Sequence, residues 1–452
     1  MGARLRSAGL AACAFGLCTA GVAAQGPSLP DTLDVERAVR MALERSPAVA
    51  SARAAAGAAG ADQRAAWGAF LPTASASLSL SRSEFTRTTF EGEEGVSEML
   101  PEPLDSGSQS ASQGLALNWT VLDGGRRFAN LSEQSANVRA AQRELDDRMA
   151  AVVAAAGRAF YEGLRSQRLL ELVERQISDR ETELDIARRR YEIAAVERID
   201  VLAAESNLLD ARVALLQSRR QAETALRALA VELGVPPDEG PGTTLVDPTD
   251  LPRMDDVATD ALVSRALGSD PELLQLDARH AAASAALWST RTAYLPRITA
   301  SLSWGRSESF ELGAPFFQLD PDDTSQRFSV SASWNLFDGF QREQQSARAS
   351  AQKRQAAEDR RLRRLEIERE VRSLAAEIAQ LAETLTLAER SLEIAEERLT
   401  MTREMYRNGT IDFTALQQAV SGVVGAERQL INLRFDYLTA WVDLAEYGGG
   451  GR

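Results

Sequence analysis

Residues that could carry chemistry are few in this sequence. The single histidine, His280, stands among alanines in an expected helix, where it is interpreted as a polar residue on the helix surface. The sequence contains no histidine-based triad, no zinc-binding spacing and no glycine-rich phosphate loop, and its carboxylates are spread at helix-surface spacing. We therefore expect no enzymatic activity, no cofactor and no metal site.

The first 24 residues have the composition of a secretory signal peptide. Arg4 and Arg6 give a positive start, an apolar stretch follows, and small residues precede Gln25, where the mature chain is expected to begin. The alternative is a short N-terminal helix that is retained.

Both cysteines, Cys13 and Cys18, lie in this segment. Cleavage after Ala24 would leave a mature chain without cysteine, so disulfides and thiol chemistry would be excluded. Leu10–Cys13 also resembles a lipoprotein processing site, and lipidation at Cys13 stays open as an alternative.

The charge of the chain excludes some partners. Its formal net charge is −14, and the loss of Arg4 and Arg6 would make it more negative, so no binding to nucleic acid is expected. The mature sequence has no run of 18 apolar residues, which a transmembrane helix requires. If the chain enters a membrane, it must do so as strands.

The sequence contains an internal duplication. Leu71-Pro72 recurs as Leu295-Pro296 at an offset of 224, and Trp119–Gly124 recurs in similar form as Trp334–Gly339 at an offset of 215. We expect a first repeat over 25–234, a linker rich in proline, glycine and aspartate over 235–254, a second repeat over 255–447 and a tail over 448–452.

Long helices are expected where proline is absent, which is the case between 104 and 235 and after 321. Helices are expected over 126–190, with a length of about 97 Å, and over 341–406. In the second, apolar residues spaced by four and three form a coiled-coil seam. Shorter helices are expected at 34–45, 47–70, 194–233, 256–267, 271–294 and 412–446. Ser46 and Asp270, each followed by proline, are expected to cap two of them.

Between the helices the sequence period changes to two. Strands are expected at about 73–82, 113–122, 297–306 and 327–337, each with one apolar face and one face of small hydroxyl residues, as in a tilted transmembrane strand. The alternative, a soluble sheet over a core, leaves no element to cover the apolar face. The loops over 82–112 and 306–326 are expected at the surface and carry Glu91, Glu93, Glu94, Asp320, Asp322 and Asp323.

Four strands have two open edges and are too few to close a barrel. The subunit is therefore expected to share its barrel with copies of itself, and a trimer would give 12 strands, although the sequence leaves the number of copies open. Trp119 and Trp334 lie at the helix end of their strands and are candidates for an interfacial aromatic belt, with ordinary packing as the alternative.

The sequence resembles the TolC-like outer membrane efflux protein family over nearly its whole mature length. The resemblance rests on Leu71-Pro72 and Leu295-Pro296, on the strand-to-helix transitions Leu122–Arg126 and Leu336–Phe340, and on the tip segments Arg190–Ala194 and Tyr406–Thr410. It implies an α+β membrane protein, a homotrimer with a 12-stranded transmembrane barrel continued by an α-helical coiled-coil tunnel across the periplasm. It also implies a bacterial outer-membrane location, a passive role in drug efflux or type I secretion, and contact with outer-membrane lipid, a periplasmic adaptor and an inner-membrane transporter.

The resemblance also assigns roles to residues. The transitions between strand and helix map to Pro72, Asp123, Gly124, Pro296, Asp338 and Gly339, and the periplasmic tips that meet the adaptor map to Ile193, Ala194, Ala195, Asn408, Gly409 and Thr410. The acidic entrance ring of the family is not matched, because Ala415 and Gln418 stand in its place. Glu197, Asp200 and Asp412 are candidates for that charge, with a solvated surface as the alternative. The competing function is that of a structural or adhesive coiled-coil protein of the cell envelope.

Overall fold

The structure is a computed structural model that describes residues 29–91, 97–193, 196–248, 251–252, 259–311 and 324–447. The expected signal segment, the tip residues Ala194 and Ala195 and most of the acidic loop residues (Glu93, Glu94, Asp320, Asp322 and Asp323) lie outside these ranges. Within the ranges, no helix combines the length and apolar character needed to cross a membrane.

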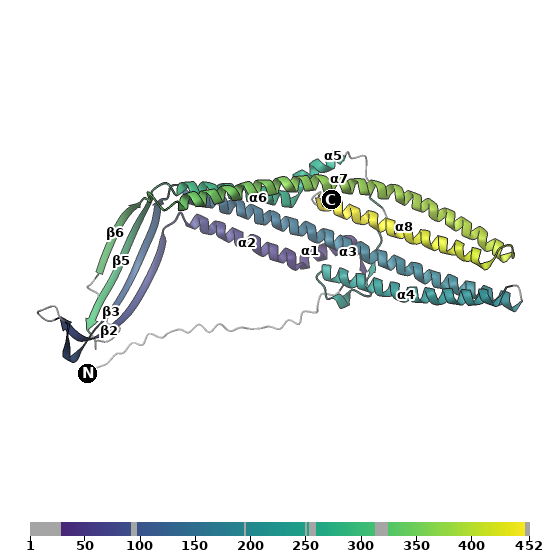
Figure 1. Ribbon diagram of the computed structural model, residues 1–452, viewed down its shortest axis with the longest axis horizontal. Helices are drawn as coiled ribbons and strands as arrows, with labels where there is room; N and C mark the ends of the chain where they lie inside the picture. The colour runs from purple at the N-terminus through teal and green to yellow at the C-terminus, as the bar shows by residue number, and fades with distance from the viewer. Residues whose placement is uncertain are drawn as a thin grey trace, which may run out of the picture.

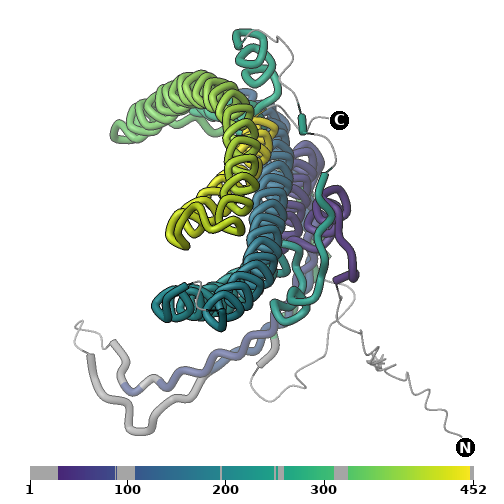
Figure 2. Tube along the Cα trace, turned by 90° about the vertical axis from the view of Figure 1, so that its right-hand side faces the viewer, coloured from purple at the N-terminus to yellow at the C-terminus, as the bar shows by residue number. Residues whose placement is uncertain are grey.

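Four long helices form a curved wall. The helices α3 (Arg126–Glu192) and α7 (Gln341–Arg407) each have 67 residues and each span about 100 Å. The helix α4 (Arg198–Glu232) returns along α3, and α8 (Phe413–Tyr447) returns along α7, with α8 also packed on α3. The order across the wall is therefore α7, α8, α3, α4, and Figure 2 shows its crescent-shaped cross-section.

The same wall continues towards the sheet with a second pair of helices. The helix α2 (Pro47–Gly68) packs on α3, whereas α6 (Pro271–Thr292) lies between α3 and α7 (Figure 1). Asp270 caps α6, since its side chain accepts a hydrogen bond from Leu273 N at 2.7 Å. The expected cap at Ser46 is wrong, because its side chain makes no such bond to α2.

The two halves correspond helix by helix. The helices α1 (Val35–Arg45) and α5 (Thr259–Ser269) have 11 residues each, and α2 and α6 have 22 each. The pairs α3 with α7 and α4 with α8 also have equal lengths, of 67 and 35 residues. Equal lengths in both halves place equivalent side chains at equivalent heights along the wall.

One antiparallel sheet stands at the end of the wall. Its order is β2 (Thr73–Glu91), β3 (Ser97–Leu122), β5 (Arg297–Glu311) and β6 (Thr324–Ser333), with β2 and β6 at the open edges (Figure 1). The expected loop over 82–112 is wrong for most of its length, because β2 and β3 continue as a paired ribbon. From Arg82 onwards polar residues stand on both faces beside isolated apolar ones such as Phe85, so the sequence no longer alternates. The strand β6 ends at Ser333 rather than 337 because the chain turns there towards α7.

The register separates two chemically distinct faces. On one face Leu117 lies opposite Leu302, which lies opposite Phe328. On the other, which we name the hydroxyl face, every second residue from Thr73 to Ser83 is serine or threonine, as is nearly every second residue of β5 and β6. Hydroxyls pair across the strands there: Ser81 with Ser110 at 2.6 Å, Thr299 with Ser331 at 2.8 Å and Ser301 with Ser329 at 2.7 Å.

The connection between the halves is fastened to the convex side of the wall (Figure 2). The strand β1 (Thr32–Leu33) pairs in parallel with β4 (Thr244–Leu245), just after the short 3₁₀ helix η1 (Pro237–Glu239). Gln167 of α3 donates to Thr243 O at 2.8 Å and accepts from Leu245 N at 3.1 Å. Leu33 and Leu245 are buried in one core with Phe160 of α3 and Phe435 of α8, so this core joins both halves.

Candidate functional site

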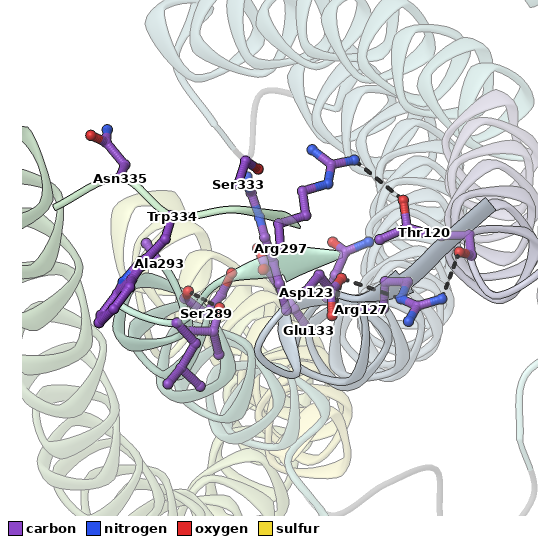
Figure 3. Close-up of a pocket in the computed structure, with 15 residues that line it drawn as sticks. Thr120, Asp123, Arg127, Glu133, Ser289, Ala293, Arg297, Ser333, Trp334 and Asn335 are labelled. Carbon is purple, nitrogen blue, oxygen red and sulfur yellow. Dashed lines mark hydrogen bonds and ion pairs between the residues drawn. The ribbon is translucent and has the colours of Figure 1, made fainter. Parts of the chain in front are cut away.

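Asp123 organises the transition from β3 to α3. Its carboxylate accepts hydrogen bonds from Gly125 N at 3.2 Å and Arg127 N at 3.1 Å, and it forms an ion pair with Arg127 Nε at 3.2 Å. Arg127 also donates to Val121 O at 3.0 Å and lies 5.1 Å from the centre of the Phe70 ring. Asp123 and Arg127 therefore connect the last strand residues, the start of α3 and the end of α2 (Figure 3).

The second half repeats this arrangement. Asp338 pairs with Arg342 Nε at 3.0 Å, and Arg342 donates to Leu336 O at 3.0 Å. Its guanidinium lies 4.6 Å from the centre of the Tyr294 ring. The two aspartates are among the predicted transition residues and the two arginines are not, although an arginine follows each aspartate by four residues.

Glycines permit the backbone turn at these transitions. Gly124 and Gly339 have φ values of 69° and 68°, in the left-handed region that favours glycine. A side chain at Gly124 would lie 2.7 Å from Leu295 Cβ, whereas the same position at Gly339 faces open space. The next residue is also left-handed in both halves, but Phe340 occupies the place of Gly125, with a φ of 68°. The left-handed conformation of Phe340 was not predicted from the sequence, because Gly125 stands at this position in the first half.

Two tryptophans fasten the strands to the preceding helices. Trp119 Nε1 donates to Phe70 O at 3.1 Å, and Trp334 Nε1 donates to Tyr294 O at 3.1 Å. The accepting residues lie just before Pro72 and Pro296, where each chain leaves its helix. Both rings stay exposed, which is compatible with an interfacial belt, and that assignment stays a prediction.

A polar cavity of about 890 Å³ lies between the two transitions (Figure 3). It is bordered by the hydroxyl face through Thr120 and Arg297, whose Nη2 donates to Thr120 Oγ1 at 3.3 Å. Arg126 and Glu133 of α3 also line it, and burial raises the pKa of the Glu133 carboxyl. The remaining lining comes from Asp123, Arg127, Asn130 and Ser289, and from Thr292, Ser333, Trp334 and Asn335 among others.

At the far end, the tips of the two helical hairpins are joined. Arg190 of α3 donates from Nη1 to Tyr406 O of α7 at 3.0 Å, and its guanidinium lies 4.4 Å from the centre of the Tyr406 ring. Tyr406 is buried and its ring centre lies 6.0 Å from that of Phe413 in α8. Burial raises the pKa of the Tyr406 hydroxyl; Arg190 opposes this shift and Asp200 adds to it.

The predicted tip residues have separate roles in the structure. Gly409, with a φ of 73°, donates to Tyr406 O at 3.0 Å and ends α7 beside Asn408. Thr410 donates through both its N and its Oγ1 to Met405 O. Ile193 is 74% exposed at the end of α3, and its contact with a partner stays a prediction.

The three candidate entrance acids also have different local contacts. Asp412 accepts a hydrogen bond from Ala415 N at 2.9 Å and so caps α8. Glu197 precedes α4 without a capping bond, and Asp200 lies in the first turn of α4 close to Tyr406. Their role in an entrance stays a prediction. Across the described ranges no group of three or more histidine, cysteine or acidic side chains is placed to hold a metal ion.

Comparisons with known proteins agree with this arrangement. The family model described as "Outer membrane efflux protein" matches residues 38–235 and 262–450. Protein CyaE of Bordetella pertussis is 30% identical over 346 residues, which cover 73% of this chain and 66% of CyaE. The alkaline protease secretion protein AprF of Pseudomonas aeruginosa is 24% identical over 293 residues, or 64% of this chain and 60% of AprF. The chain thus matches slightly less than two thirds of the length of these relatives.

Solved structures share the fold. The CmeC outer membrane channel of Campylobacter jejuni superposes with a TM-score of 0.79 at 15% identity, covering 92% of this chain and 86% of CmeC. The outer membrane protein VceC of Vibrio cholerae gives a TM-score of 0.75 at 19% identity, covering 92% of this chain and 96% of VceC. The two-repeat architecture of sheet and long helices is therefore one already seen in outer membrane channels.

Proposed function

This chain belongs to the outer membrane efflux protein family, and from that membership we propose that it is one subunit of a passive duct through the outer membrane. The observation that carries the proposal is the two-faced sheet joined directly to helices about 100 Å long. Its apolar face suits lipid and its hydroxyl face suits a wet lumen. The duct does no chemistry, and the energy for transport comes from an inner-membrane partner.

The sheet requires other subunits. Its outer strands, β2 and β6, present unpaired backbone groups, which hydrocarbon does not tolerate. Pairing β6 of one subunit with β2 of the next satisfies both edges, and three subunits supply 12 strands. We propose a homotrimer, because the open edges require a closed ring of subunits and the family resemblance implies three.

The helical wall has matching open edges. On α4 the exposed residues Leu202, Leu209, Val213 and Leu216 form a seam, and on α7 so do Leu387, Ile394 and Met401. The offset of 215 carries the α7 seam residues Leu387 and Met401 onto Leu172 and Ile186 of α3, and carries Leu209 onto Val424 of α8. Leu172 is buried, and Ile186 and Val424 pack against a shared core between α3 and α8. The α3–α8 contact is thus a template for α7 against α4 of the next subunit.

Charges support this template. In the α3–α8 contact, Arg168 and Arg434 both bind Asp247 of the connection, at 3.3 and 3.1 Å. The offset of 215 carries Arg168 onto Glu383 and Arg434 onto Arg219. These two exposed residues form no ion pair within the described part of their own chain. They would pair directly between subunits.

The named relatives favour one class of cargo. AprF is described as a secretion protein for an alkaline protease, and we extend secretion of a polypeptide to this chain as its proposed task. In that task the hairpin tips, including Ile193, Asn408, Gly409 and Thr410, meet a periplasmic adaptor. The adaptor would shift the tips between a closed and an open arrangement by binding the open one more tightly. Glu197 and Asp200 would lie at this entrance.

The experiment that tests the proposal is single-channel conductance of the purified protein in a planar bilayer, with the oligomeric mass measured in the same detergent. We expect a trimer with small currents, because the Arg190–Tyr406 contact keeps the tips together. A monomer that gives no conductance would contradict the duct.

A further inference from the structure

The hydroxyl face carries more basic than acidic side chains at the helix end of the sheet. From the helix end of the sheet to the level of Ser110 and Ser309, the described strand residues of this face include no aspartate or glutamate. The first acidic residue beyond that level is Glu311, opposite Ser108. The residues up to that level include two arginines, Arg297 and Arg327. This contrasts with the chain as a whole, which has a net charge of −14.

The register fixes the positions of these two arginines. Arg297 lies opposite Ser333 at the helix end, and Arg327 lies opposite Ser303, six residues further along β6. The two levels are therefore about 20 Å apart along the strands. Both side chains are exposed, and Arg327 forms no ion pair with any described residue.

Between these two levels the face offers little apolar surface. Its side chains between these levels are mainly serine and threonine, and several already pair with each other across the strands. A wall of paired hydroxyls gives a passing chain weak, exchangeable hydrogen bonds and no apolar site.

We propose that this face favours acidic, extended polypeptide as cargo and that Arg327 is a specificity-determining residue of the barrel segment. The inference rests on the proposed function, because it requires the hydroxyl face to line the lumen. In a trimer Arg297 and Arg327 each form a ring of three cations within walls of low dielectric, which concentrates anions and repels cations. The preference belongs to the barrel and is separate from any acidic entrance at the tips.

The test uses the full-length protein in a planar bilayer, with a short polyglutamate peptide or a polylysine peptide of equal length added on the side of the β2–β3 ribbon. Added there, the peptides reach the barrel without passing the tips. We expect polyglutamate to block the wild-type current and polylysine to block it less. Arg327→Gln should lower the rate of polyglutamate block about tenfold, and Arg327→Glu should reverse the order of the two peptides.

Arg306→Gln is the matched control. Arg306 lies opposite Thr324, three residues from the Ser303 level, but on the apolar face of the sheet. We expect the two peptides to block the Arg306→Gln channel at the same rates as the wild-type channel. Equal block of the wild type by both peptides, or equal effects of Arg327→Gln and Arg306→Gln, would overturn the inference while leaving the duct intact. A protein that forms no channel would instead remove the proposed function, and the inference with it.

Discussion

Arg190 and Tyr406 join the two helical hairpins of one subunit at their tips. The arginine donates to the tyrosine carbonyl at 3.0 Å and lies 4.4 Å from the centre of its ring. The first residue ends the hairpin of α3 and α4, and the second ends that of α7 and α8. A movement that separates the hairpins must therefore break this contact.

Removing the contact should open the duct. Arg190→Ala deletes a charged hydrogen bond and a cation–π contact, so we expect the open fraction of single-channel recordings to rise about tenfold. Arg189→Ala is the control, because among the described residues Arg189 pairs only with Asp185, one turn earlier in the same helix, and is well exposed. If both variants conduct like the wild type, the contact does not hold the tips closed.

The contact between subunits can be tested by exchanging charges. Glu383→Arg should weaken the trimer, by up to about 1 kcal/mol at each interface, because it would face Arg219 of the next subunit. Adding Arg219→Glu should restore the temperature at which the trimer dissociates in detergent. Glu396→Arg, away from the exposed seam of α7, should leave that temperature unchanged. If the double variant dissociates at the same low temperature as Glu383→Arg, the two residues do not face each other between subunits.

The two transition glycines form a matched pair for a stability measurement. Gly339→Ala adds only backbone strain, so it should lower the free energy of unfolding by about 1–2 kcal/mol. Gly124→Ala adds the same strain and also a contact of 2.7 Å with Leu295 Cβ, so it should cost clearly more. Chemical unfolding in detergent measures both, and equal losses would contradict the crowding at Gly124.

Asp147 of α3 should make stability depend on pH. Burial raises the pKa of its carboxyl above the ordinary 3.8, and the carboxylates of Asp270 and Glu446 add to the shift while Arg148 and Arg363 oppose it. The folded state then holds this proton more tightly than the unfolded state. The bound proton on Asp147 therefore contributes fully to the free energy of unfolding below the ordinary pKa. This contribution is lost as the pH rises through the pKa of the folded state.

Replacing Asp147 by a residue that does not titrate should remove this loss of stability at higher pH. Asp147→Asn should be more stable than the wild type near neutral pH, and the difference should vanish in acid. The readout is the free energy of unfolding across the pH range. Asp146→Asn is the neighbouring control, because Asp146 is exposed and pairs with Arg143. A pH profile unchanged by Asp147→Asn would show that this carboxyl does not contribute.

The sequence predicts much of the fold because its signals are local. The absence of proline marks α3 and α7, and the alternation of serine with leucine marks the helix end of the sheet. The ribbon beyond Arg82 was not predicted, because polar residues stand on both of its faces and the sequence does not alternate there. The sequence also placed β6 too far along the chain, because Trp334 serves the turn through its bond to Tyr294 O.

Some residues of the candidate site could be predicted from the sequence and others could not. Asp123 and Asp338 were recognisable because each stands beside a glycine in a repeated motif. Their arginine partners were not, since Arg127 and Arg342 act by reaching back to Val121 O and Leu336 O. The Arg190–Tyr406 contact spans 216 residues, and only the packing of α3 against α8 brings its two ends together.

The core that joins both halves imposes an order on assembly. Leu33 near the start, Leu245 in the middle and Phe435 in the last helix are all buried together, so the first half cannot complete its interior from its own residues. A chain emerging from the export machinery would stay incomplete until α8 has arrived. Loss of that last helix should therefore prevent folding of the first half as well. Only full-length chains would then fold and insert into the membrane, as a consequence of packing alone.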